Sequence, residues 1–267
     1  MFNDLYSLKG KRAWVCGSSQ GIGLASAQAL AIAGAEVTLL ARNRDRLIQV
    51  LETLNVDAGQ QHSIIVSDFS QATALEQAIV NHQSDIENKP IHILVNNSGG
   101  PKPGPAHLAK SIDFVAAFEQ HLLCNHILMQ HLLPGMKTSG YGRIINIIST
   151  SVKAPLPNLG VSNTIRAAVA NWSKTLSREL APYGITVNNV LPGATLTSRL
   201  TGIISDKAGK LKLDEDEVRQ EMLSEIPAGR FGTADEIAAA VLFLASPLAG
   251  YINGINIPVD GGRTASL

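Results

Sequence analysis

Three glycines near the start of the chain have the spacing of a phosphate-binding turn. They lie in Gly17-Ser18-Ser19-Gln20-Gly21-Ile22-Gly23, directly after the apolar run Arg12–Cys16 and before a helical pattern. Glycine permits a tight turn and lets backbone N–H groups approach a pyrophosphate at a helix N-terminus. A flexible loop is the alternative, but a position between a first strand and a first helix favours a dinucleotide site.

The residue that would face the adenosine ribose is basic. In a dinucleotide site an acidic residue about 20 positions after the turn usually holds the ribose 2′-hydroxyl. Here the second apolar run, Ala35–Ala41, is followed by Arg42-Asn43-Arg44. A guanidinium forms bidentate, charge-assisted bonds with phosphate, so Arg42 suits a 2′-phosphate. We therefore expect NADP(H) to be preferred, with NAD(H) as the alternative; a surface arginine at a helix start is the other interpretation of Arg42.

Short apolar runs alternate with longer amphipathic stretches along the chain, and these elements must position any site. Buried strands are predicted at Arg12–Cys16, Ala35–Ala41, His62–Ser67, Ile91–Asn96, Arg143–Ile148 and Ile185–Val190. Helices are predicted at Ile22–Ala33, Arg44–Asn55, Ala72–Glu87, Ile112–Met136, Ser162–Ala181 and Ala234–Ala245. The unbroken β-α-β order predicts an α/β fold: one Rossmann-type, doubly wound parallel sheet with helices on both faces, forming a single domain over residues 1–267.

One charged segment, Thr197–Glu225, interrupts this rhythm between the sixth strand and the helix at Ala234–Ala245. Such a segment is usually a solvated face. Because ligands bind beyond the carboxyl ends of an open parallel sheet, we predict instead that residues 197–225 form a lid on the substrate side.

Composition excludes several classes of function. The chain has 267 residues, 45% hydrophobic and 16% charged, with a formal net charge of zero. This gives no bulk attraction to nucleic acid or anionic membrane. No stretch has the roughly 18 apolar residues of a membrane span, and the first residues do not resemble a signal peptide.

The two cysteines, Cys16 and Cys124, lie in apolar runs and match no metal spacing. We therefore expect both to be buried free thiols in a reducing cytoplasm. The histidines show no metal-ligand spacing, so no metal is expected.

Further motifs follow the remaining strands. They are Asn96-Asn97-Ser98-Gly99, Ser149 at the end of the fifth strand, Pro192-Gly193-x-x-x-Thr197, and Val259-Asp260-Gly261-Gly262 near the C-terminus. With the glycine turn, they resemble the short-chain dehydrogenase/reductase family over essentially the whole chain. The segments LKGKRAWVCGSSQGIG and GRFGTADEIAAAVLFLAS are most similar to its acyl-carrier-protein-reductase-like branch. Cys16 departs from the family's usual threonine.

The resemblance implies a set of cofactor contacts. They are Gly17, Ser19, Gln20, Gly21, Ile22, Gly23, Arg42, Asp68, Phe69, Asn97, Gly99, Arg166, Pro192, Gly193 and Thr197. Asp68 and Phe69 would flank the adenine, and Thr197 would bond the nicotinamide amide or a phosphate. Two alternatives need no cofactor: Asp68 as a helix cap and Asn97 as a brace of the sheet.

The family's catalytic positions are also implied, and here the sequence departs from the pattern. Members use a serine, a tyrosine that exchanges a proton with the carbonyl or alcohol oxygen, and a lysine four residues later that binds the nicotinamide ribose. Ser149 matches the serine, whereas the tyrosine and lysine positions fall at Ser162 and Arg166. The family's asparagine falls at His121, with Asn125 one helical turn away.

The pair S-x-x-x-R has physical consequences. Positions i and i+4 share a helix face, so Ser162 and Arg166 are expected to project into the site together. Arg166 keeps a positive charge and can keep the ribose contact. Ser162 is shorter than tyrosine and a far weaker acid; its alternative role is the N-cap of its helix.

Three hypotheses follow. The first is a reductase that uses another acid, with Lys102, Lys153 and His121 as candidates, or a water held by Ser149, Ser151 and Ser162. The second is the same cofactor with a substrate whose protonation is less demanding. The third is a catalytically reduced NADP(H)-binding protein acting as a sensor or structural subunit. Ser149 and the complete cofactor motif favour an active or weakly active oxidoreductase on a carbonyl or alcohol.

The expected partners are a small-molecule substrate and further copies of the chain. By resemblance, Ile112–Met136 and Ser162–Ala181 would form a helical interface between subunits. A homotetramer is expected, with a dimer as the alternative, and neither nucleic acid nor membrane is expected as a partner. The identity of the substrate does not follow from the sequence.

Overall fold

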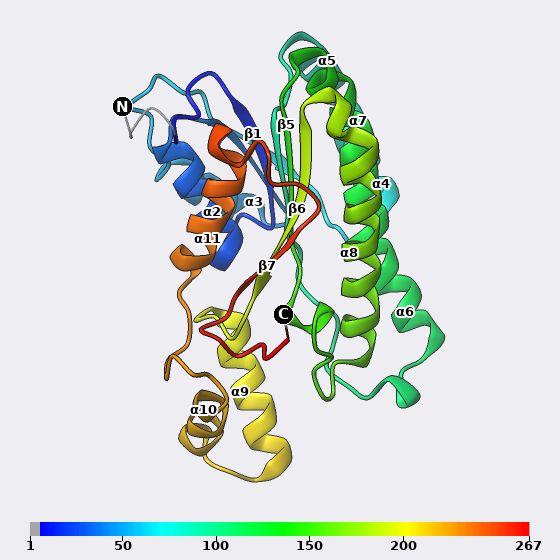
Figure 1. Cartoon of the computed structure of the whole chain (residues 1–267), viewed down its shortest axis with the longest axis vertical. Helices are drawn as coiled ribbons and strands as arrows, with labels where there is room; N and C mark the ends of the chain where they lie inside the picture. Colours follow the sequence, from blue (N-terminus) through cyan, green and yellow to red (C-terminus); the bar gives the residue numbers. More distant parts are fainter. Residues whose placement is uncertain (1–5, 267) are drawn as a thin grey trace.

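Seven parallel strands form one sheet in the order β3-β2-β1-β4-β5-β6-β7 in the computed structural model, which describes residues 6–266 (Figure 1). The strands are β1 (Arg12–Cys16), β2 (Glu36–Ala41), β3 (Ser63–Val66), β4 (Ile93–Asn96), β5 (Gly142–Ile147), β6 (Ile185–Pro192) and β7 (Asn256–Val259). The strand order reverses at β1, which pairs with both β2 and β4. In open parallel sheets this reversal leaves a crevice beyond the carboxyl ends of the strands. The expected Rossmann-type sheet is confirmed.

Helices cover both faces of the sheet. On one face lie α2 (Gly21–Ile32), α3 (Arg44–Leu51) and α11 (Ala234–Ala245); on the other lie α4 (Ala72–Val80), α5 (Gln83–Asn88), α7 (Cys124–Ser139) and α8 (Gly160–Leu180). Alternation along β1 fills both cores, because Ala13 and Val15 pack on the first face and Trp14 and Cys16 on the second. Within residues 6–266 no helix has the length and apolarity that a membrane crossing needs.

The remaining helices lie beside the carboxyl ends of the strands. α6 (Ser111–Phe118) continues into a π-helical segment, Glu119–Leu123, and then into α7. The segment predicted as a lid contains α9 (Ser198–Leu211) and α10 (Glu215–Ser224), which project below the sheet in Figure 1. Their own small core places Leu200, Ile204 and Val218 against Phe231.

Several elements differ from the sequence-based expectation. The helix expected at Ala72–Glu87 is two helices, α4 and α5, and the one expected at Ile112–Met136 is interrupted by the π-helical segment. The six predicted strands are present with small shifts of their ends, and the seventh, β7, was not predicted. Pro258 and a polar first residue, Asn256, hide its pattern.

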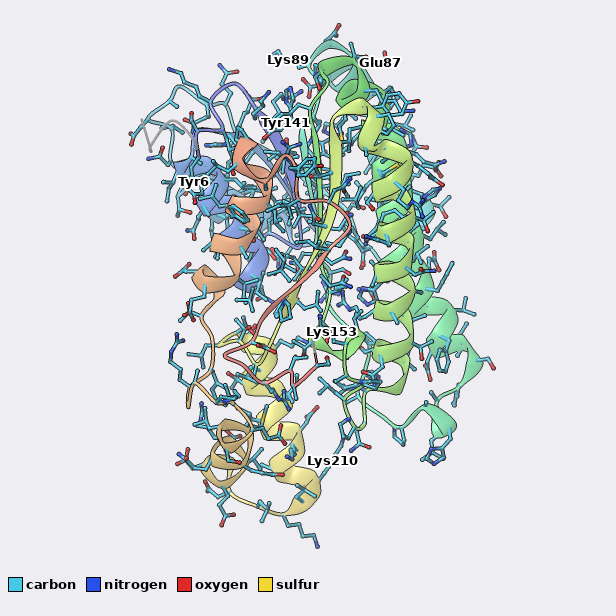
Figure 2. All side chains as sticks on the ribbon, in the orientation of Figure 1. Tyr6, Glu87, Lys89, Tyr141, Lys153 and Lys210 are labelled. Atoms are coloured by element: carbon cyan, nitrogen blue, oxygen red, sulfur yellow. The ribbon has the colours of Figure 1, made fainter. Side chains whose placement is uncertain are left out.

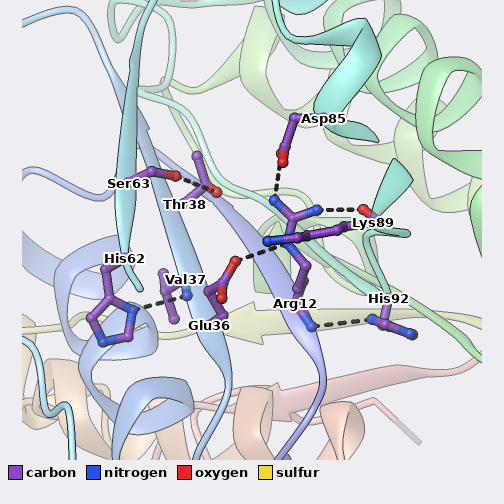
Figure 3. A network of polar contacts seen from close by, with 9 residues as sticks. All are labelled: Arg12, Glu36, Val37, Thr38, His62, Ser63, Asp85, Lys89 and His92. Atoms are coloured by element: carbon purple, nitrogen blue, oxygen red, sulfur yellow. Dashed lines mark hydrogen bonds and ion pairs between the residues drawn. The ribbon is translucent and has the colours of Figure 1, made fainter. Parts of the chain in front are cut away.

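The amino ends of the strands are tied by a polar network centred on Arg12 (Figure 3). Its guanidinium donates to Glu36 at 3.0 Å, to Asp85 of α5 at 2.5 Å and to the carbonyl of Lys89. The backbone N–H of Arg12 donates to Nδ1 of His92 at 3.1 Å. The charged groups of this network are therefore partnered with one another at the amino ends of the strands, away from the crevice.

A row of asparagines crosses the other half of the sheet. Asn96, Asn146, Asn189 and Asn256 are consecutive register partners on β4, β5, β6 and β7. Hydrogen bonds between their side-chain amides, at 2.8, 3.0 and 2.8 Å, join each asparagine to the next. Ser173 of α8 hydrogen-bonds both Asn146 and Asn189 at 2.8 Å. Buried, connected polar groups of this kind fix one register, so the row locks α8 against the strand ends that border the crevice.

Candidate active site

The glycine turn joins β1 to α2, and its three glycine positions have no room for a side chain. Gly17 and Gly21 adopt positive φ of +60° and +56°. A Cβ added to Gly23 would lie 2.2 Å from the carbonyl oxygen of Gly17. Nδ2 of Asn97 donates to the carbonyls of Cys16 (3.3 Å) and Gly17 (3.4 Å). Asn97 therefore braces both the end of β1 and the start of the turn.

A hollow on the surface lies beyond the carboxyl ends of β2 and β3. It has a volume of about 560 Å³ and is lined by Arg42, Asn43, Val66, Ser67, Asp68 and Ala74. The hydroxyl of Ser67 is buried there without a hydrogen-bond partner among residues 6–266. Backbone bonding from Ser70, with the charge of Arg42, lowers the pKa of Asp68. Asp68 is not a helix cap, because α4 has Gln71 at its N-cap. Its Oδ1 accepts from the backbone N–H of Ser70 at 2.9 Å, and its side chain also lines the hollow.

Two predicted cofactor contacts lie elsewhere. Phe69 is 7% exposed and packs in the core with α4 and α7 rather than in the hollow. Gly99 is exposed and does not line either hollow; its carbonyl accepts from Gln120 at 3.1 Å. Ser67 was missed because only the structure shows that its hydroxyl is buried and unpaired.

The main cavity, about 790 Å³, lies beyond the carboxyl ends of β4, β5 and β6, under α9 and α10. Of the predicted site residues it is lined by Ile22, Asn97, Ser149, Ser162, Arg166, Pro192, Gly193 and Thr197. These residues come from five separate segments of the chain, and the fold brings them to one place. Gly21 also faces this region, because a Cβ there would lie 3.2 Å from Cγ2 of Thr197.

Ser149 follows β5 and caps a short 3-10 turn. Its Oγ accepts from the backbone N–H of Ser151 at 3.1 Å. The hydroxyl proton of Ser149 is therefore not needed for the cap and can be donated into the cavity. Ser151 is 3% exposed and does not line the cavity, so it is a poor candidate for holding a water there.

Helix α8 carries Ser162 and Arg166. It begins at Gly160, with Leu159 at the N-cap, so the interpretation of Ser162 as the N-cap is wrong. Gly160 permits this start, since a Cβ there would lie 2.4 Å from the backbone nitrogen of Ala106. Ser162 and Arg166 lie one turn apart and line the same cavity.

Arg166 is held firmly at the end of the strands. Its side chain is 8% exposed, and its Nη1 and Nη2 donate to the carbonyls of Ile147 (2.9 Å) and Ser98 (3.5 Å). Burial, with the charge of Arg199, lowers the pKa of Arg166 to about 10. The guanidinium therefore remains charged at neutral pH and presents a fixed cation to the cavity.

His121 lies in the π-helical segment behind this cation. Its Nδ1 shares a 2.7 Å hydrogen bond with Oγ of Ser98, and its Nε2 is buried without a partner among the described residues. Burial, with the charges of Arg166 and Arg199, lowers the pKa of His121 to about 2. The imidazole is neutral, and it does not line the cavity.

The other candidate acids are not at the cavity. Neither Lys102 nor Lys153 lines it, although Lys153 lies near the lower ends of the strands in Figure 2. None of the four tyrosines lines it either. A titratable residue that sequence reasoning missed does: Arg199, whose Nη1 donates to the carbonyl of Gly100 at 3.2 Å.

Comparisons with known proteins give a consistent pattern. Residues 17–264 match the profile of a family described as enoyl-(acyl carrier protein) reductase. The chain is 32% identical to the NADPH-dependent reductase BacG of Bacillus subtilis, over 96% of this chain and 99% of BacG. It is 34% identical to the 3-oxoacyl-[acyl-carrier-protein] reductase FabG of Vibrio cholerae, over 96% and 98%. The structure of L-sorbose reductase from Gluconobacter frateurii, complexed with NADPH and L-sorbose, has a TM-score of 0.90 at 30% identity, over 98% and 100%.

Proposed function

The chain belongs to the short-chain dehydrogenase/reductase family, and we propose that it reduces a carbonyl group with NADPH in a site built on Ser149, Ser162 and Arg166. It is an NADP(H)-dependent oxidoreductase acting on a carbonyl or alcohol, like the reductases it is similar to. In this proposal Ser149, Ser162 and Arg166 form the reacting site without a tyrosine.

The described residues fit the cofactor at both of its ends. The glycine turn has the close backbone packing that admits a pyrophosphate, and α2 begins at Gly21. The hollow at Arg42 offers a guanidinium and the unpaired hydroxyl of Ser67, which suit a 2′-phosphate. Arg166, Asn97, Pro192, Gly193 and Thr197 would hold the nicotinamide half. When bound, NADPH supplies the hydride.

The chain's own residues must then place the substrate and manage a proton. Ser149 would donate a hydrogen bond to the reacting carbonyl oxygen. Arg166 would hold the nicotinamide ribose and lend positive charge as that oxygen becomes negative. Ser162 is too short to replace a tyrosine, so it would hold a water that delivers the proton to the oxygen.

The observation that carries this proposal is the convergence of Ser149, Ser162 and Arg166 on one cavity beside the glycine turn. The test is NADPH oxidation with a panel of ketones, quinones and acyl thioesters. At least one compound should be reduced, and Ser149→Ala should lower its turnover. Tight NADPH binding with no turnover on the whole panel would instead favour the sensor or structural-subunit hypothesis.

We also propose that residues 1–267 form a single catalytic domain in which 197–225 is the lid. Residues from both α9 and α10 line the cavity, among them Ile203 and Met222.

We propose a cytoplasmic location, which the free, buried thiols of Cys16 and Cys124 support. The subunit arrangement we propose is a homotetramer.

A further inference from the structure

Arg199 bridges the lid and the wall of the cavity. It is the second residue of α9, and its Nη1 donates to the carbonyl of Gly100 at 3.2 Å, in the loop after β4. The side chain lies close against this loop, since a Cβ added to Gly100 would be 2.5 Å from Nη2 of Arg199. One N–H of the guanidinium is therefore used, and others remain for a ligand in the cavity.

The cavity holds positive charge that the protein does not neutralise. Lys207 pairs with Glu221 at 2.8 Å, and Arg263 pairs with Glu225. Asp206 and Lys210 also line the cavity, and their opposite charges cancel in the sum. Neither Arg166 nor Arg199 has a carboxylate within 4.0 Å among residues 6–266. Two unpaired guanidiniums at one cavity favour the binding of an anion.

The position of Arg199 separates this anion from the cofactor phosphates. Thr197 is the residue that lies over the glycine turn. Arg199 instead contacts the loop after β4, and its charge is close enough to lower the pKa of both Arg166 and His121. It therefore stands at the reacting end of the site rather than over the turn.

The rest of the cavity wall is largely apolar. Leu156 and Leu159 come from the segment before α8, and Ile203 and Met222 come from the lid. A ligand that fits this cavity would combine a charged group at Arg199 with an apolar body.

We propose that Arg199 binds the carboxylate of the substrate, so that the reductase acts on an oxo acid with an apolar body. This assignment rests on the proposed function, because it places the carboxylate of the compound whose carbonyl is reduced. A planar, bidentate guanidinium fork matches a carboxylate, and closure of the lid onto the substrate would bring α9 and its arginine to it.

The first test compares oxo acids with their methyl esters as substrates for NADPH oxidation, in the parent and in Arg199→Gln. The 4-oxo acid levulinate and 2-oxo-4-phenylbutyrate, each with its ester, cover short and bulky bodies. In the parent, the acid should have the higher kcat/KM. Arg199→Gln should raise the KM of the acid about tenfold or more and change that of the ester less than about twofold.

Arg219→Gln is the matched control, because Arg219 is on α10 and does not line the cavity. It should leave the KM of the acid unchanged. Equal losses for acid and ester in Arg199→Gln would overturn the proposal. So would a loss of NADPH affinity as large as the loss for the acid, since the anion would then be a cofactor phosphate. A preference for dihydroxyacetone phosphate over every oxo acid would likewise overturn the carboxylate assignment.

A binding measurement distinguishes failure of this inference from failure of the proposed function. The enzyme with bound NADPH is titrated with benzoate and glutarate and with their neutral amides, followed by NADPH fluorescence. Carboxylate binding that the amides do not show, and that Arg199→Gln abolishes, supports the site even if no compound is turned over. Turnover of neutral ketones with no binding of either carboxylate would leave the reductase standing and overturn the anion site.

Discussion

A guanidinium at residue 166 changes what α8 can contribute. A lysine can move and exchange a proton, whereas Arg166 is bonded to the carbonyls of Ile147 and Ser98 and stays charged with a pKa of about 10. The role that we propose for Arg166 is thus to bind and to stabilise negative charge, with the proton coming through another group. Because His121 is neutral and set back from the cavity, the route that we propose is a water beside Ser149 and Ser162.

Cofactor binding separates the two residues of the S-x-x-x-R pair. Arg166→Ala should weaken NADPH binding by roughly 1.5–3 kcal/mol, the range for a hydrogen bond to a charged group. Ser162→Ala should leave NADPH affinity nearly unchanged and lower turnover only modestly. Fluorescence titration of NADPH measures both. Unchanged affinity in Arg166→Ala would mean that Arg166 does not face the cofactor.

The choice between NADPH and NADH tests Arg42 in the same way. The parent should bind NADPH more tightly than NADH, because Arg42 lines the hollow with Ser67 and would pair with the 2′-phosphate. Arg42→Ala should lose affinity for NADPH by about tenfold or more and keep its affinity for NADH. Arg44→Ala is the neighbouring control, since Arg44 is exposed and does not line this hollow. Equal affinities of the parent for the two cofactors would contradict the prediction.

At the scale of elements, the sequence predicted the regular βα units well and the irregular ones poorly. β1 and α11 have the predicted bounds, because their apolar periodicity is clear and Thr233 caps α11. Ser162 was misjudged because a helix can begin at Gly160 only if the backbone packs against Ala106, a long-range contact. Arg199 was missed because its direction depends on where α9 begins, and charge alone predicted only a lid.

The π-helical segment explains why the position of His121 could not be predicted from the sequence. It places His121 beside Ser98 and leaves Nε2 buried without a partner, an arrangement no local pattern encodes. π-helical turns inside α-helices occur frequently at functional sites. Here the segment sits next to Arg166, and its histidine supports the Ser98 whose carbonyl accepts from that arginine.

His121 should make the protein sensitive to acid. In the unfolded chain its pKa is near 6.5, whereas burial lowers the folded value to about 2. Between these pH values the unfolded state binds the extra proton, so stability rises with pH and is lost as the pH falls below about 6.5. The loss is at most about 1.4 kcal/mol per pH unit.

Urea unfolding at pH 7 and pH 5 measures this effect. His121→Asn should lose less free energy of unfolding between the two pH values than the parent does. His107→Asn, at an exposed position, should behave as the parent. A pH dependence that is the same in His121→Asn as in the parent would show that His121 is not the responsible group.

On the scale of the whole molecule, charged side chains are arranged differently at the two ends of the strands. The amino ends of the strands carry a self-satisfied ionic network around Arg12, whereas the carboxyl ends carry Arg166 and Arg199 without carboxylate partners among residues 6–266. The asparagine row and Ser173 connect the strands to α8 between these two ends. The fold thus pairs Arg12 with carboxylates at the amino ends and leaves two guanidiniums without a carboxylate where a ligand would bind.

The surface of α6 bears on the subunit arrangement. Ile112, Val115 and Phe118 are 64%, 58% and 45% exposed, and their spacing of three residues places them on one side of the helix. Leu123, at the end of the π-helical segment, is 37% exposed. Exposed apolar residues on one side of a helix are typical of a protein–protein interface, so they favour α6 as a contact between subunits of the homotetramer that we propose.

Light scattering should give a mass near four times the 28.3 kDa chain. Val115→Glu with Phe118→Glu should yield a smaller species, because two carboxylates would be buried without partners in the interface. Ile32→Glu is the matched control: Ile32 is 72% exposed at the end of α2, on the opposite face of the sheet, and its replacement should leave the mass unchanged. A parent that remains monomeric at high concentration, or a double variant that remains tetrameric, would place the interface elsewhere than on α6.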